Sequence, residues 1–452
     1  MENNSTNTTL SAPPRRAALV FIFITVLIDI LAFGLIIPVL PHLIENFLAG
    51  NVSRAAVWYG YFSTAFFAMQ FIFTPVQGAL SDWLGRRPVI LLSNLGLGLD
   101  FILMATVNTL PLLFIGRIIS GITAASFSTS NAYVADVTPP EKRAQAFGMI
   151  GMAFGIGFIV APAIGGLLGA INLRLPFWCA VAMCLTNFVY GVFVLPESLP
   201  KEKRTPHFDW AHANPVGSLK LLRRYPQVLG LVGVLFLMAL AHMVYPTTFV
   251  LYADYRFHWG PDMVGFTLAL VGVLAAIVQG GLIKKIVGTL GERHALLFGL
   301  GCGTVGFILY GLAPTGYWFW AAMPVAALWG VAGPAAQAIM THHVDPREQG
   351  RLQGAVASLS AIAGIIAPTL FTRLFAVVTQ SGWHDAWVGT TFWLAAAMVG
   401  SALLLAWYSV AHLPKAVDVT PASQPPEAIV TSEIIAGAAE LEPPFNENET
   451  RA

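Results

Sequence analysis

The chain has 452 residues, of which 56% are hydrophobic and only 10% charged, with a formal net charge of +1. Soluble domains carry about 25% charged residues, so a chain with so little charge cannot cover a water-facing surface of this size. This composition excludes an ordinary soluble protein and a disordered one, and the absence of a basic excess argues against a nucleic-acid partner. The sequence therefore predicts an all-α integral membrane protein that sits in a lipid bilayer.

Apolar runs long enough to cross a bilayer recur along the chain. Roughly 20 helical residues span a hydrocarbon core of about 30 Å, whereas a membrane barrel would need alternating segments of about 10 residues. Most of the 24 Lys and Arg residues fall on the side of the N-terminus, which predicts that both termini are cytoplasmic. The sequence predicts twelve transmembrane helices, within residues 18–41, 58–80, 88–108, 111–135, 144–170, 176–196, 228–252, 263–283, 294–313, 317–341, 352–378 and 387–411.

An internal repeat divides these helices into two sets. Pro41 and Gly60 recur 205 residues later as Pro246 and Gly265. Further pairs recur at shifts of 202 and 206 residues, namely Gln77-Gly78 with Gln279-Gly280 and Ala161-Pro162 with Ala367-Pro368. Two like halves around a central site are an architecture of secondary transporters. The predicted domains are a cytoplasmic tail (1–17), a six-helix half (18–196), a cytoplasmic linker (197–227), a pseudo-symmetric six-helix half (228–411) and a disordered cytoplasmic tail (412–452).

Three ionisable residues fall inside predicted spans, where a charge is costly and indicates function. Asp29 and Asp100 lie near the middle of the first and third spans, and Arg117 lies near one end of the fourth. A carboxyl in such surroundings can bind and release a proton near neutral pH, as a coupling site must. Asp29 is the favoured proton carrier, since Gly34 and Pro38 let its helix approach a cavity. For Asp100 a structural role is an equal alternative, and Arg117 is expected to hold a carboxylate.

The loop at residues 78–88 reads GALSDWLGRRP and carries several charges between two predicted spans. Gly78 and Gly85 allow a tight turn, and Arg86 is expected to pair with Asp136. Asp82 is expected to accept hydrogen bonds from a helix N-terminus in the other half, near residue 351. We expect these contacts to form only when the two halves close on the cytoplasmic side, so that they control which side is open.

Polar side chains within the apolar runs give a second group of candidates. Four of them are candidates for the substrate cavity, with interhelical hydrogen bonding as the alternative: Asn131, His242, Tyr245 and Gln337. The three cysteines form no zinc pattern, and adjacent His342 and His343 do not face one site on a helix. No Gly-Lys-Ser/Thr phosphate-binding motif occurs, so ATP is excluded as the energy source. The sequence predicts neither a bound metal nor a cofactor.

The loop 78–88 resembles the signature of the major facilitator superfamily. The stretches 116–121 and 136–143 resemble its second motif, and 157–166 is similar to the antiporter motif, with Ala161 where glycine is usual. Within the superfamily the closest resemblance is to the 12-helix tetracycline:proton antiporters, through residues 29–41, 262–266 and 352–359. The antiporter-motif residues that this resemblance implies are Gly157, Pro162, Gly165 and Gly166.

The resemblance implies drug export in exchange for protons and adds functional positions. It assigns Arg87 and Arg143 to the conformational gate with the charged loop residues, and Gln70 and Gln279 to the cavity. Two positions depart from the family pattern: Ala275 replaces a histidine of the eighth helix, and Cys302 replaces an acid of the ninth. These departures move proton handling onto the N-terminal half, and His242 is a candidate replacement for the missing histidine.

Together these observations predict a proton-coupled secondary transporter of the cell (inner) membrane rather than an enzyme. The expected substrate is a small amphipathic drug, with a tetracycline-like compound as the lead candidate, exported by alternating access. The proton gradient is the expected energy source, and a metal ion is expected only as part of a chelated substrate. An exporter of a metabolite, or a broad multidrug exporter without a tetracycline preference, is the alternative.

Overall fold

The structure is a computed structural model, and it describes residues 15–124, 126–139, 142–208, 225, 228–344, 348–381 and 385–412. Across these residues all regular structure is helical, without a strand. The helices are α1 (Arg15–Ile36), α2 (Leu40–Phe47), α3 (Val52–Leu84), α4 (Arg86–Thr106), α5 (Leu110–Thr123), α6 (Ser126–Val137), α7 (Arg143–Ile171), α8 (Leu175–Val194), η2 (Lys201–Lys203), α9 (Leu229–His242), η5 (Tyr245–Phe249), α10 (Val250–Phe257), α11 (Pro261–Ile277), η6 (Val278–Leu282), α12 (Ile283–Leu312), α13 (Gly316–Ala327), η7 (Leu328–Val331), α14 (Ala332–Thr341), α15 (Gln349–Gln380), η8 (Asp385–Gly389) and α16 (Thr390–His412).

Each predicted span coincides with a described helix or with a run of consecutive helices. Ten stretches of the described residues are long and apolar enough to cross a membrane, and one of them, Pro261–Leu312, has 52 residues. Gly291, with φ +75°, breaks this stretch into two passages. The 33-residue helix α3 supplies a further passage. The described helices therefore accommodate the twelve predicted passages, and the chain is a multi-pass membrane protein.

Several passages are interrupted instead of running as one straight helix. A turn at residues 37–39 separates α1 from α2, and α5 ends at Thr123 before α6 begins at Ser126. The π-helical segment η5 separates α9 from α10, and the 3-10 segment η7 separates α13 from α14. In the twelve-passage count these are the first, fourth, seventh and tenth passages, the same position in every group of three, and the π-helical segment η6 also interrupts the eighth passage. Irregular backbone at membrane depth is tolerated where protein or a cavity surrounds it.

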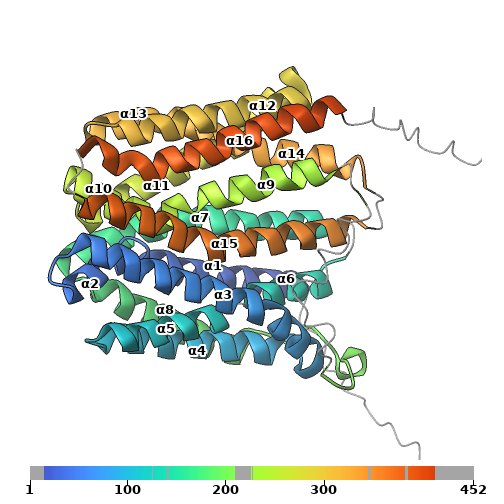
Figure 1. The fold of residues 1–452 in the computed structure, drawn as a ribbon. Helices are drawn as coiled ribbons and strands as arrows, with labels where there is room; N and C mark the ends of the chain where they lie inside the picture. Colours follow the sequence, from blue (N-terminus) through green and yellow to red (C-terminus); the bar gives the residue numbers. More distant parts are fainter. Residues whose placement is uncertain are drawn as a thin grey trace, which may run out of the picture. The chain divides into compact units, whose positions relative to one another are not determined.

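The two ends of the helical bundle differ, and Figure 1 shows them on opposite sides. We call the end with α2 and the junction of α10 with α11 the Glu45 end. The opposite end, where α3 meets α4 and α14 terminates, is the Arg86 end. At the Glu45 end the halves touch through two helix pairs, α3 with α15 and α7 with α11. Among described residues, the hydrogen bonds between α3 and the second half join residues 53–64 to residues 246 and 365–379.

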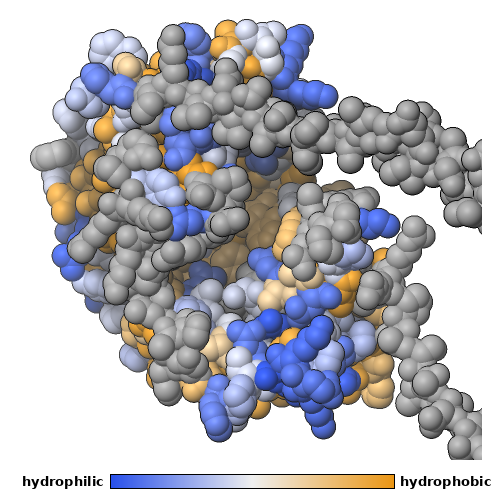
Figure 2. Space-filling view, turned by 90° about the vertical axis from the view of Figure 1, so that its right-hand side faces the viewer, coloured by the Kyte–Doolittle hydropathy of each residue, from blue (hydrophilic) through white to orange (hydrophobic). Residues whose placement is uncertain are grey.

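At the Arg86 end the halves part. Figure 2 looks onto this end and shows a hollow with an apolar floor between polar rims. Residues on α7 and at the α11–η6 junction near this end, including Met152 and Ile277, are exposed. The described residues thus adopt a state that is closed at the Glu45 end and open at the Arg86 end.

The predicted domain boundaries fall partly outside the described residues. Most of the tail 1–17, residues 209–224 of the linker and residues 413–452 belong to this undescribed part. The boundaries proposed there remain predictions. Within the described part, Thr205 N donates a hydrogen bond to Asp82 O at 3.0 Å, so the start of the linker lies against the first half.

Candidate functional site

Asp29 lies on α1 and is 6% exposed, enclosed by polar groups of its own half. Asn187 of α8 donates from Nδ2 to Asp29 Oδ1 at 2.9 Å and to the Thr25 carbonyl at 3.0 Å. With its amide nitrogen turned toward the acid, Asn94 of α4 donates to both Asp29 oxygens at 3.1 Å. Two amides from two helices therefore hold this carboxyl group in place. Such donors stabilise the charge that burial opposes.

Asp100, on α4, is 1% exposed and lies against α5. The Ser120 hydroxyl donates to Asp100 Oδ2. The other carboxyl oxygen, Oδ1, is buried without a hydrogen-bond partner among described residues and faces Gly116, where an added Cβ would approach to 3.1 Å. Glycine at that position leaves room for the acid.

Arg117 lies one helical turn from Ser120 and is 6% exposed. Its guanidinium carbon sits 4.5 Å from the centroid of the Phe66 ring, and it is within electrostatic range of Asp100 and Tyr59. No ion pair within 4.0 Å joins it to an acid in the described part of the chain, and its Nε lacks a hydrogen-bond partner there. The aromatic face of Phe66 supplies part of the stabilisation that a buried cation needs. Arg117 therefore lies near the Asp100 carboxyl group without forming an ion pair within 4.0 Å with it.

A charged cluster surrounds Arg86 where α4 begins. Arg86 Nη1 lies 2.6 Å from Asp82 Oδ1, and Arg86 Nε lies 3.1 Å from Asp136 Oδ2. Nη1 also donates to Ser81 Oγ at 2.6 Å, and the Arg86 backbone amide donates to Glu197 Oε1 at 2.9 Å. The contact of Arg86 with Asp136 that the sequence predicts is present. These groups belong to the first half, apart from Glu197 at the start of the linker, so the cluster forms while the Arg86 end is open.

Gly85, which directly precedes Arg86, has a backbone conformation that favours glycine. Gly85 adopts φ +109°, and a Cβ there would collide with the side chains of Glu197 and Arg204. Those two residues form an ion pair of 3.3 Å, which closes the cluster from the linker side. Arg87 turns away and donates to the Val192 carbonyl. A Cβ at Gly78 would meet only Ser128 Oγ, at 3.6 Å, so this glycine is not sterically required in the present state.

Two further gate expectations concern Asp82 and Arg143. Asp82 pairs with Arg86, and no hydrogen bond among the described residues joins it to the start of α15, the helix N-terminus near residue 351 that was expected to donate to it. Arg143 begins α7, and its side chain also lies outside the described residues. The expectation that the whole cluster requires closure of the halves does not hold for Arg86, because both of its acidic partners belong to the same half as the arginine.

The small residues of the antiporter motif contact two different helices. Gly157 and Gly165 of α7 face Ile30 and Leu35 of α1. Gly166 faces α11 in the other half, where a Cβ would lie 2.9 Å from the Gly265 Cα. Pro162 lies inside α7, and its carbonyl faces Gly265. Close approach of helix backbones through small residues is the usual way that membrane helices pack. Here it joins the two halves near the Glu45 end.

The predicted cavity residues do not form one cluster. Asn131, His242, Gln279 and Gln337 are exposed, on four different helical segments, and Gln70 and Tyr245 are partly buried. Of the six, the structure brings together His242 and Tyr245, whose ring centroids are 5.8 Å apart. Gln279 lies in the π-helical segment η6, and π-helical turns occur frequently at functional sites.

A cavity of about 240 Å³ opens beside His242. It is lined by Met238, Ala239, His242, Trp329, Gly330 and Gly333, from α9, η7 and α14. The His242 ring lies 5.9 Å from the Trp329 ring, and the lining is largely apolar. Such a wall of thioether and aromatic groups with one polar ring suits an amphipathic ligand.

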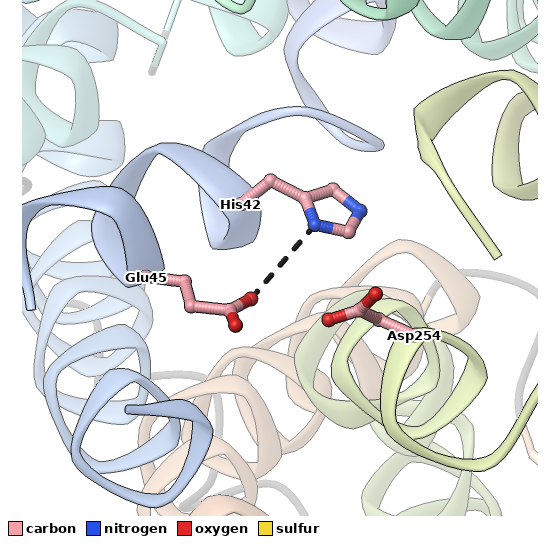
Figure 3. Close-up of side chains that lie close together, drawn as sticks. All are labelled: His42, Glu45 and Asp254. Carbon is pink, nitrogen blue, oxygen red and sulfur yellow. Dashed lines mark ion pairs between the residues drawn. The ribbon is translucent and has the colours of Figure 1, made fainter. Parts of the chain in front are cut away.

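Sequence reasoning missed several partner residues. Asn94 and Asn187 are amides within apolar runs, and their position in predicted spans was a signal that could have found them. Glu197 gave no signal, because only the fold brings the start of the linker to Arg86. A cluster of His42, Glu45 and Asp254 at the Glu45 end was also missed (Figure 3). It joins α2 to α10, which are distant in sequence.

The chain matches the family model of the Major Facilitator Superfamily over residues 22–368. It is 37% identical to the tetracycline resistance protein, class C, of Escherichia coli, over 82% of this chain and 93% of that protein. It is 34% identical to the class H protein of Pasteurella multocida, over 90% of this chain and all of that protein. The solved structure of the human organic anion transporter MFSD10 (TETRAN) is 25% identical, with a TM-score of 0.64, over 87% of this chain and all of that chain.

These matches cover both halves and the residues described above. They confirm the resemblance that the loop 78–88 and the repeat predict, and they exclude an enzyme in favour of a transport protein. The chain belongs to the major facilitator superfamily.

Proposed function

We propose that this protein is a proton-coupled antiporter that exports a small amphipathic drug, with tetracycline-like compounds as the lead class. The observation that carries the proposal is its 37% identity to a tetracycline resistance protein over 93% of that protein's length. The hollow at the Arg86 end supports it, because an exporter must open toward the cytoplasm to load its substrate (Figure 2). In this proposal the Arg86 end is cytoplasmic, as are both termini, and the membrane is the cell membrane.

Asp29 is the proposed proton carrier. It is buried and has no cationic partner within 4.0 Å among described residues, while two amides hold it. An acid that is held by neutral donors can lose and regain a proton without breaking an ion pair, and its charge then changes how α1 packs against α4 and α8. Asp100 is the second candidate, because its Oδ1 is unpartnered and Arg117 is near.

In the proposed cycle, Asp29 releases its proton to the cytoplasmic side and the substrate enters between the halves. The wall beside His242 then contributes the aromatic and thioether contacts to the substrate. Closure of the Arg86 end and opening of the Glu45 end expose the substrate to the other side. Protonation of Asp29 from that side favours release, and the protein returns to the state described here.

Purified protein in liposomes tests the proposal directly. Tetracycline uptake into inverted vesicles is followed together with internal pH. Uptake should move protons out of the vesicle lumen, so the internal pH should rise only when the substrate is present. Asp29→Asn should reduce proton-driven transport to the level of empty liposomes, because a neutral amide cannot carry a proton. Glu202→Gln, which removes an exposed acid on η2, is the matched control and should transport normally. Normal proton-driven transport by Asp29→Asn would overturn the assignment of Asp29.

A second substrate class has support from one relative. The human organic anion transporter MFSD10 (TETRAN) covers 87% of this chain with 25% identity. The same vesicles are therefore also offered unrelated drugs and organic anions as substrates for uptake. Proton movement driven by organic anions but not by tetracyclines would favour a metabolite exporter over a tetracycline exporter.

A further inference from the structure

Three potential metal ligands meet where the two halves touch at the Glu45 end. His42 and Glu45 lie on α2 of the first half, and Asp254 lies on α10 of the second. One ligand atom from each lies within 4.8 Å of the others, and His42 Nδ1 is 4.0 Å from Glu45 Oε2. Figure 3 shows all three side chains directed into the same space between the two helices.

The histidine of this cluster makes no hydrogen bond in the described part of the chain, and its ion pair with Glu45 is long. The His42 side chain is 12% exposed, and its Nε2 is buried without a hydrogen bond. The 4.0 Å separation of Nδ1 from Glu45 is too long for a hydrogen bond. A buried imidazole nitrogen without a hydrogen bond is unusual, since buried polar atoms are nearly always satisfied. A ligand between the ring and the two acids would supply the missing interaction.

The two acids also need a positive partner. Glu45 and Asp254 place carboxyl oxygens within 4.8 Å of each other, so two carboxyl groups face each other across the junction of the halves. Two charged carboxylates at this distance repel each other unless a proton or a cation separates them. Arg256 lines the same cavity but forms no ion pair within 4.0 Å with either acid among described residues.

The cavity beside the cluster gives an ion access and room for water. Its volume is about 490 Å³, and its lining includes Glu45, Asp254, Arg256 and His258. One imidazole and two carboxylates are a donor set for zinc and its neighbours among the divalent transition metals. Three protein ligands leave the fourth coordination position of the ion open to water, so the ion could exchange with the solution. Ligand atoms on one zinc ion lie about 3.3 Å apart, so the side chains need to move together by at most about 1.5 Å.

We propose that His42, Glu45 and Asp254 form a binding site for a divalent transition-metal ion that bridges the two halves and holds the Glu45 end closed. The ligands come from both halves, so the site exists only while this end is closed. A bound ion therefore stabilises the state that is open at the Arg86 end. An ion that holds the Glu45 end closed should also inhibit transport. This inhibition rests on the proposed antiport function, whereas the binding of the ion does not.

Direct binding to the full-length protein tests the site. Zn²⁺ is titrated against the purified transporter in competition with a chromogenic chelator. We expect one bound ion, and at least about tenfold weaker binding in His42→Asn and in Asp254→Asn, since loss of even an outer-shell partner costs that much. His294→Ala removes an exposed histidine of α12 and should bind like the parent. Equal affinity in the parent and in both ligand variants would overturn the proposal.

A distance measurement tests the bridge and guards against misfolded variants. Spin labels on exposed Arg54 of α3 and exposed Gln380 of α15 report the separation of the halves beside the Ser53–Thr379 contact. Zn²⁺ should increase the short-distance population in the parent and leave it unchanged in Asp254→Asn. Asp254→Glu, which keeps the carboxylate, should restore the response. A Zn²⁺ response that persists in Asp254→Asn would contradict the bridge.

The two proposals fail separately. His42-dependent Zn²⁺ binding in a protein without any substrate-dependent proton flux would support the metal site and overturn the antiport. Proton-coupled transport that Zn²⁺ inhibits equally in the parent and in His42→Asn would support the antiport and overturn this site.

Discussion

The Glu45 end and the Arg86 end use different chemistry. At the Glu45 end, outside the His42, Glu45 and Asp254 cluster and the Arg373–Tyr61 bond, the halves meet through small residues, hydroxyls and backbone groups, such as Gly166 against Gly265 and Ser53 Oγ 2.6 Å from Thr379 Oγ1. At the Arg86 end the charged groups bond within the first half, around Arg86. Uncharged contacts can separate without leaving a buried charge unpaired. The charged cluster stays intact in the open state and presents a preformed surface for closure.

The interrupted passages fit this division. Tyr59 of α3 donates to the carbonyl of Pro246 at 2.6 Å, and Pro246 lies in the π-helical segment η5. A backbone carbonyl of this irregular segment is therefore an acceptor for the other half at the closed end. The interruption thus provides a contact between the halves, as well as a bend in the seventh passage.

The largest effect is expected from filling the close contact between α7 and α11. Gly166→Leu places a side chain where the backbones of Pro261 and Gly265 lie, so the halves cannot close at the Glu45 end. Overpacking costs about 1–3 kcal/mol where neighbours can shift, and more against backbone. Transport should fall to background, and the distance between labels at Arg54 and Gln380 should lengthen.

Gly155→Leu is the matched control for this substitution. Gly155 lies in the same helix, and a Cβ there meets no atom within 4 Å. It should keep the short label distance of the parent. A short distance in Gly166→Leu as well would show that this glycine contact does not hold the Glu45 end closed.

A smaller effect is expected from breaking the charged cluster. Arg86→Ala removes the bonds to Asp82 and Asp136 and leaves two acids without their cation. A hydrogen bond to a charged group contributes roughly 1.5–3 kcal/mol when buried and less when its partner is exposed, as Asp82 is, so we expect a total loss of about 2 kcal/mol in stability, measured by thermal unfolding in detergent. Arg87→Ala loses only a bond to a backbone carbonyl and should change stability less. Equal losses in the two variants would argue against a special role of the cluster.

The smallest effect is expected from a single hydroxyl at the closed end. Thr64 Oγ1 lies 2.9 Å from Thr369 Oγ1 and 3.1 Å from the Ile365 carbonyl. Thr64→Val keeps the shape and removes these bonds between the halves, which contribute about 1 kcal/mol. The closed population should fall by about fivefold relative to the open one. Thr106→Val, which loses only bonds within α4, should leave the label distances unchanged.

The sequence by itself determined the helical membrane class and the family, and it predicted twelve passages in two halves. Apolar runs of bilayer length have few alternatives to helix, and the repeated Pro and Gly positions locate the halves. It also located the pairing of Arg86 with Asp136, because the loop 78–88 is so specific. Asp29 and Asp100 stood out because charge is rare in such runs.

Only the tertiary structure decided the partners of these groups. The amides that hold Asp29 come from α4 and α8, and the glutamate beside Arg86 comes from the linker. The His42, Glu45 and Asp254 cluster combines two helices that are more than 200 residues apart in the printed sequence. Spacing along one helix predicts which residues share a face, but contacts between helices depend on how whole helices pack. The packing also decided which end of the bundle is closed, because the contacts between the halves form only between residues that the fold brings together.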